Sequence, residues 1–100
     1  MSNASPDDLA VTFRSIPRRL REAHGSASQE TTASATTELN GLLHEAATMM
    51  GTTADPAAIA DAIADRHPTE WDDATLVRLG QLALDMGRLL RHIAALAEAE

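Results

Sequence analysis

The chain has 100 residues, a formal net charge of −7, no cysteine and only two aromatic residues, Phe13 and Trp71. This length allows one domain with a modest core, and the absence of cysteine excludes disulfides, thiolate metal sites and cysteine catalysis. The acidic charge disfavours binding to nucleic acid or to anionic membranes. No apolar run reaches the roughly 18 residues of a membrane span, so we predict a single soluble domain over residues 1–100.

The composition predicts an all-α protein. Alanine is abundant and favours the helical state, whereas the β-branched residues are mostly threonines in polar stretches. All eight basic residues are arginine, which indicates the coding bias of a GC-rich bacterial genome or adaptation to salt. Residues 1–9 lack the basic and apolar regions of a secretory signal, so we expect a cytoplasmic protein. The predicted architecture is a small bundle of about four helices.

The first predicted helix spans about residues 6–24. Ser5 and Pro6 suit its N-cap and first turn, and Gly25 follows its end. Pro17 interrupts the pattern, and we predict a kinked but continuous helix rather than a break with Ser15 as a new cap. Residues 1–5 and 25–30 are predicted to be flexible. The apolar face of this helix consists of Leu9, Phe13, Ile16 and Leu20.

The second predicted helix spans about residues 30–50 and is stopped by Gly51. Its apolar residues recur at intervals of four and three, which is the spacing of one helix face. Leu43 and Met50 flank that face and widen it. The face itself consists of Ala35, Leu39, Leu42, Ala46 and Met49.

Two further helices complete the predicted bundle. Asp55 and Pro56 start a short helix over about residues 56–66, and Pro68 ends it. A longer helix follows over about residues 73–98. Its apolar line consists of Leu76, Leu79, Ala83, Met86, Leu90, Ile93 and Ala97, and Leu82, Leu89 and Leu96 form a second line one heptad apart.

The two long helices are predicted to form an antiparallel pair, braced by the first helix and the short one. Their combined apolar stripe is wider than a two-stranded coiled-coil seam and requires more than one neighbour. Because large apolar side chains are few, we predict that the stripe serves the core, a dimer interface or both. It consists of Leu39, Leu42, Leu43, Met49, Met50, Leu79, Leu82, Met86, Leu89, Leu90, Ile93 and Leu96.

A basic face on the first helix is a candidate binding surface. Arg14, Arg18 and Arg21 recur at helical spacing, and residues 1–24 carry four arginines against three acidic residues, whereas the remainder is acidic. These arginines could grip an acidic partner. The favoured alternative is that they face the protein's own acidic helices or solvent.

Trp71, just before the last helix, is the other candidate. It either closes one end of the bundle against the short helix, which we favour, or is exposed as an anchor for a partner.

The sequence predicts no catalytic, cofactor or metal site. His44-Glu45 lacks the second histidine of a His-Glu-x-x-His zinc motif, because residue 48 is threonine. The serines show no nucleophile-elbow motif, and the carboxylates are scattered over caps and outer faces.

The leading functional prediction is a non-enzymatic protein–protein interaction module, homodimeric through the two long helices. One alternative is a small regulator or adaptor of the antitoxin kind, which grips an acidic partner through the first-helix arginines. Another is a helical-hairpin protein of the kind exported by type VII systems, which length, acidity and alanine content fit. That class has a Trp-x-Gly turn between its long helices, whereas here Trp71 is followed by Asp72-Asp73, and we claim no family resemblance.

Overall fold

Four α-helices and one short 3-10 helix form the chain in the computed structural model, which describes residues 5–100. These described residues contain no strand, so the predicted all-α bundle is confirmed. None of their helices is both long enough and apolar enough to cross a bilayer. The elements are α1 (Pro6–His24), α2 (Gln29–Met50), α3 (Pro56–Asp65), η1 (Pro68–Glu70) and α4 (Asp73–Ala99).

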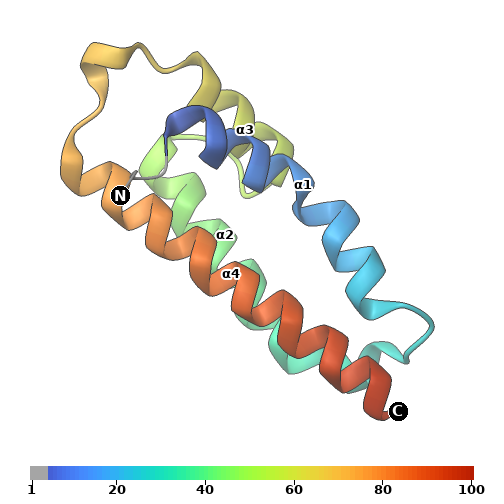
Figure 1. Cartoon of the computed structure of the whole chain (residues 1–100). Helices are drawn as coiled ribbons and strands as arrows, with labels where there is room; N and C mark the ends of the chain where they lie inside the picture. The colour runs from blue at the N-terminus through green and yellow to red at the C-terminus, as the bar shows by residue number, and fades with distance from the viewer. Residues whose placement is uncertain (1–4) are drawn as a thin grey trace.

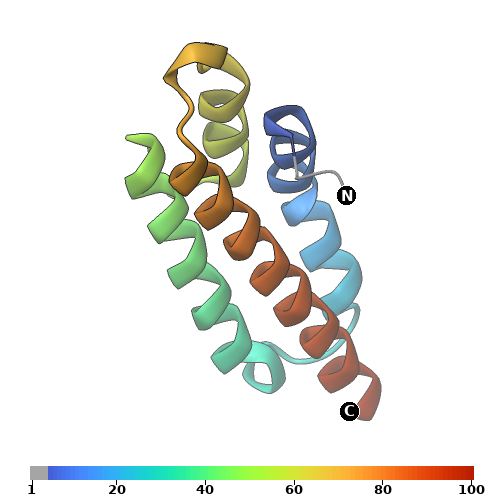
Figure 2. The ribbon, with the colours of Figure 1, turned by 60° about the vertical axis from the view of Figure 1, so that its left-hand side comes forward.

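The longest helix, α4, lies in the middle of the bundle, with α2 on one side and α1 on the other (Figures 1 and 2). Its direction is antiparallel to α2, as predicted for the two long helices, and parallel to α1. The short α3 packs mainly on α1 and also contacts α2. The resulting body measures 47 × 31 × 18 Å, so both flanks of α4 have a long boundary with a neighbouring helix.

Local sequence signals explain where the helices begin and end. The Ser5 hydroxyl accepts a hydrogen bond from the Asp8 N–H at 3.2 Å, and Pro6 occupies the first turn of α1. At the end of α2, Gly51 adopts a φ of 66°, a left-handed conformation that glycine adopts without a steric cost. The Asp72 carboxylate accepts from the Thr75 N–H at 2.7 Å and caps α4.

Helix α1 continues through Pro17 without a break. The alternative in which Ser15 caps a new helix is therefore excluded, and the Ser15 hydroxyl instead donates to the Thr12 carbonyl at 2.7 Å. A bend at Pro17 stays a prediction.

The loop between α1 and α2 is short, and α2 begins at Gln29, close to the predicted start at about residue 30. The Glu100 carboxylate at the end of α4 accepts hydrogen bonds from the Ser28 N–H at 3.0 Å and from the Thr31 hydroxyl. This contact ties the start of α2 to the end of α4. The other segment predicted to be flexible, residues 1–5, lies outside the described residues except for Ser5, which caps α1.

The core lies where all four helices meet. Phe13 is fully buried, and the one buried polar residue among those described, Thr32, has its hydroxyl 3.0 Å from the Nδ1 atom of His24. The buried face of α2 differs from the predicted one, because Leu43 is buried whereas Leu42 is only half-buried. The largest fully buried apolar side chains are Phe13, Ile16, Leu39, Ile59, Ile63, Leu79, Leu82, Met86 and Ile93.

Most of the predicted apolar stripe lies inside the chain. Its buried members are Leu39, Leu43, Leu79, Leu82, Met86, Leu90 and Ile93. Its half-buried members are Leu42, Met49, Met50, Leu89 and Leu96. The stripe therefore serves mainly the intramolecular core, and little of it is free for a second chain.

The capping carboxylates give the fold a dependence on pH. The hydrogen bond from the Thr75 N–H lowers the pKa of Asp72, and those from the Thr31 hydroxyl and the Ser28 N–H lower the pKa of Glu100. A lowered pKa means that the ionised carboxylate is favoured in the folded state. Its contribution to stability is present above the pKa of the unfolded chain, about 4, and is lost as the pH falls through the folded pKa.

We therefore expect the melting temperature of Asp72→Ala to be lower than that of the wild type near neutral pH. The difference should shrink on acidification to below about pH 4, because the wild-type cap then becomes protonated. Thermal unfolding followed by circular dichroism measures both values. A difference that stays constant over this range would contradict the proposed role of the ionised cap.

Candidate functional site

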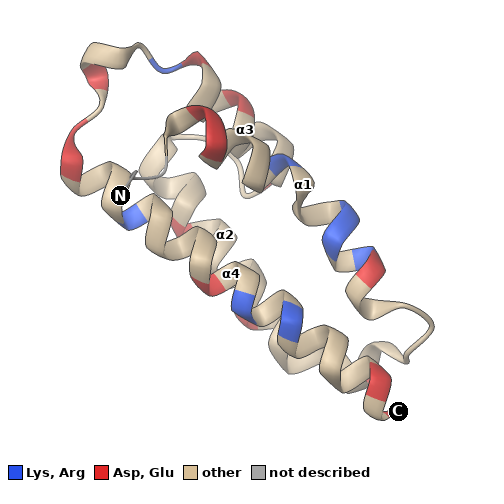
Figure 3. Cartoon of the chain, viewed as in Figure 1, with Lys and Arg blue, Asp and Glu red and all other residues tan. Residues whose placement is uncertain are grey.

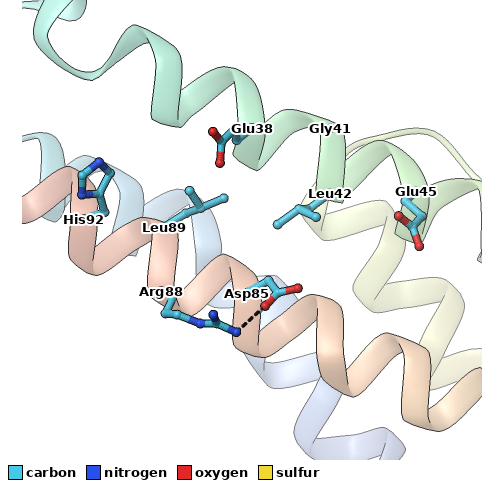
Figure 4. Close-up of a pocket in the computed structure, with 8 residues that line it drawn as sticks. All are labelled: Glu38, Gly41, Leu42, Glu45, Asp85, Arg88, Leu89 and His92. Atoms are coloured by element: carbon cyan, nitrogen blue, oxygen red, sulfur yellow. Dashed lines mark hydrogen bonds and ion pairs between the residues drawn. The ribbon is translucent and has the colours of Figure 1, made fainter.

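Two grooves follow the flanks of α4, one against α2 and one against α1. The α2–α4 groove encloses about 610 Å³. Figure 4 shows Leu42 and Leu89 pointing toward each other across it, with charged side chains along both helices. Its lining consists of Glu38, Gly41, Leu42, Glu45, Asp85, Arg88, Leu89 and His92.

The charges of the α2–α4 groove are largely compensated within the chain. Arg88 pairs with Asp85 at 2.6 Å, and Arg78 pairs with Glu45 at 2.5 Å. Both pairs are exposed, where an ion pair contributes at most about 1 kcal/mol. The groove therefore offers a partner little unpaired charge.

The α1–α4 groove is larger, at about 770 Å³. Its floor contains the buried Leu9 of α1 and the half-buried Leu76 and Ala83 of α4. Farther out, Val77 and Leu84 are 58% and 70% exposed. The remaining lining residues are Asp8, Thr12, Arg19, Asp73, Gly80, Gln81, Gly87 and Arg91.

Exposed apolar side chains concentrate at this groove. Only three large hydrophobic residues are exposed in the described part of the chain, namely Val11, Val77 and Leu84, and the last two line the α1–α4 groove. Single exposed apolar residues are ordinary, whereas neighbouring ones beside a groove are typical of an interaction surface.

The charges of the α1–α4 groove are separated along its length. Asp8 and Asp73 lie in the first turns of the parallel helices α1 and α4, where carboxylates interact favourably with the helix dipoles. Arg19 and Arg91 approach each other toward the opposite end, since both guanidinium groups would lie within 4 Å of a Cβ atom at Gly87. Figure 3 shows basic residues on the later parts of both helices, with one more near the start of α4. The groove therefore has an acidic end and a basic end.

The two arginines of the basic end form no ion pair within the part of the chain that the structure describes. The ion pairs there involve Arg14, Arg78 and Arg88, and neither Arg19 nor Arg91 takes part in one. Two like charges that share a site repel each other, so an external acidic group at this end would be favourable.

Arg14, Arg18 and Arg21, the arginines predicted to form a binding surface, lie outside this groove. Arg14 forms an ion pair with Asp61 of α3 at 3.0 Å, so one of the three faces the protein's own acidic helix. Arg18 and Arg21 are exposed and make no ion pair among residues 5–100. None of the three lines either groove.

Trp71 lies between η1 and α4 and is partly buried against the hydrophobic core. The guanidinium carbon of Arg66 lies 5.0 Å from the centroid of the indole ring, within the range of a cation–π contact. Trp71 therefore contributes to packing at this end of the bundle while part of its surface stays accessible.

The groove residues of α4 are not among the residues predicted from the sequence, although their spacing is a signal. Val77, Gly80, Leu84, Gly87 and Arg91 recur at intervals of three and four, the spacing of a helix face beside the buried line. Gly80 and Gly87 make this series of residues less apolar than the adjacent leucine-rich series of α4, which is therefore the stronger pattern in the sequence.

The described residues contain no group of three or more histidine or acidic side chains that could hold a metal ion. His44 and His92 are exposed, as their positions relative to the apolar stripe predict. Comparisons with protein-family models, curated proteins and solved structures found no match to this chain.

Proposed function

We propose that this protein is a non-enzymatic helical interaction module that forms a homodimer. The observation that supports the proposal best is the α1–α4 groove, where Val77 and Leu84 are exposed beside charges that the chain itself does not pair. A chain of this size has a modest core, and association would bury additional apolar surface.

Light scattering coupled to size-exclusion chromatography tests the proposal. The expected mass is twice the 10.6 kDa of one chain, with a return toward one chain on dilution. A mass of one chain up to millimolar concentration would contradict the homodimer.

A second candidate is an adaptor that binds an acidic partner through α1, which the exposure of Arg18 and Arg21 favours. Titration with a polyglutamate peptide, followed by calorimetry, provides a direct probe. Binding should be lost in the double variant Arg18→Ala, Arg21→Ala and kept in Arg14→Ala, because Arg14 is already paired with Asp61. Equal binding by all these variants would exclude this surface.

A further inference from the structure

The face of α4 that borders the α1–α4 groove has a pattern that is symmetric about residue 82. In three pairs of groove residues equidistant from residue 82, one residue complements the other, either by opposite charge or by a large apolar side chain facing a glycine. These pairs are Asp73 with Arg91, Val77 with Gly87, and Gly80 with Leu84, and the remaining pair, Gln81 with Ala83, is uncharged.

We propose that a second copy of this chain docks on this face, with the two α4 helices antiparallel. The two-fold axis passes outside α4 at the level of residue 82 along the helix, since the Leu82 side chain itself lies in the core. This inference rests on the proposed homodimer and specifies its surface and its orientation. A two-fold interface brings the same patch of both copies together, so each residue meets its symmetry-related partner in both directions. This complementarity requires antiparallel helices, because a parallel register would place like residues opposite each other.

The apolar part of the interface consists of side chains packed over glycines. Leu84 of each copy lies over Gly80 of the other, and Val77 lies over Gly87. A Cβ atom built at Gly80 meets nothing within 4 Å, so the space beside this glycine is open in the single chain. Glycine inside a helix is unfavourable relative to alanine, and close approach of a second helix gives this position a structural reason.

The charged part of the interface lies at its two ends. Asp73 of each copy meets Arg91 of the other, about 13 Å along the helix from the axis on either side. In the single chain Gly87 is buried, with the ends of Arg19 and Arg91 beside it. In the dimer these flexible ends turn toward the carboxylates of the second copy and free Gly87 for Val77.

Helix α1 extends the same complementarity. Because α1 runs parallel to α4, its Asp8 lies at the acidic end of the groove and its Arg19 lies at the basic end. The second copy presents the reverse order, so the charges of both helices face opposite charges. The α2–α4 groove lacks this property, since Asp85 and Glu45 are already paired within the chain.

Charge reversal at Asp73 or at Arg91 tests whether these two residues meet across the proposed interface. Asp73→Arg and Arg91→Asp should each weaken self-association by at least about tenfold, because like charges then meet at both ends. In an equimolar mixture of the two variants, each arginine faces a carboxylate again, and a heterodimer should form with affinity near that of the wild type. Sedimentation velocity measures all three samples. Arg88→Asp reverses a charge on the other flank of α4 and should leave the dimer intact.

Closure of the open space beside Gly80 provides a second test. Gly80→Leu should give a monomer, because leucine blocks the approach of Leu84. At a dilution where the wild type is also monomeric, this variant should melt at a higher temperature, because leucine favours the helix. Gly41→Leu is the matched control, since Gly41 lies within α2, has open space beside it and lines the other groove. It should also raise the melting temperature, while the dimer is kept.

The outcomes separate this inference from the proposed function. Loss of association in the single charge variants and in Gly80→Leu, with recovery in the mixture, supports the antiparallel interface. A wild-type dimer that none of these variants affects overturns this interface and leaves the homodimer standing. A wild-type monomer overturns both. Circular dichroism melts confirm that each variant is folded before its mass is interpreted.

Discussion

Phe13→Ala should lower the free energy of unfolding by about 3–5 kcal/mol. Phe13 is fully buried in the shared core, and it is one of only two aromatic residues in the sequence. Truncation removes the largest apolar side chain of α1 and leaves a cavity beside α3 and α4, the helices on which α1 packs. Because small domains are stable by only about 5–15 kcal/mol, this loss is a large fraction of the total.

Urea denaturation followed by circular dichroism measures this loss. Val11→Ala is the control, because Val11 lies two residues earlier on α1 and is 69% exposed. It should change the free energy of unfolding by less than about 0.5 kcal/mol. Equal and small effects of both substitutions would contradict the placement of Phe13 in the core.

Leu82→Asp should prevent folding near neutral pH. Leu82 is fully buried in the core cluster. None of the ion pairs of the described chain involves a core position, so a carboxylate at residue 82 would be desolvated without a partner. The expected far-ultraviolet spectrum is that of a largely unfolded chain.

Leu84→Asp makes the same substitution two residues later, where the leucine is 70% exposed. This variant should keep the helical spectrum and a cooperative melt, because its carboxylate remains in water. We expect this variant to fold normally and to be impaired only in forming the proposed dimer. A folded Leu82→Asp variant, or an unfolded Leu84→Asp variant, would show that the two faces of α4 have been assigned the wrong way round.

The helices could be predicted from the sequence because their ends carry local signals. Ser5 with Pro6, and Asp72 with Asp73, satisfy or complement the free N–H groups of a first turn, whatever the rest of the chain does. The Gly51 stop is equally local, since it depends on the conformation of one residue. These features needed no knowledge of how the helices pack.

The exact buried face of α2 could not be predicted in the same way. Leu42 and Leu43 are adjacent, and spacing alone fits either of them into an apolar face. The position of α4 relative to α2 decides between them, and it leaves Leu42 at the α2–α4 groove while Leu43 enters the core.

The roles of the arginines also depend on tertiary structure. Arg14 meets Asp61 only because α1 packs on α3, a contact between residues 47 positions apart. Arg19 and Arg91 approach each other because α1 and α4 run parallel. A charge pattern along one helix cannot reveal which neighbour it faces, so the α1–α4 groove emerged only from the structure.

A single introduced cysteine tests the central claim most directly, because the natural chain has none. In the antiparallel arrangement the two copies of residue 81 lie about 3 Å apart along the helix direction, whereas those of residue 95 lie about 39 Å apart. Gln81 and Ala95 are both exposed on α4. A short thiol-specific crosslinker should therefore convert Gln81→Cys, but not Ala95→Cys, into a covalent dimer visible by denaturing electrophoresis. Crosslinking of both variants, or of neither, would contradict an antiparallel dimer centred beside residue 82.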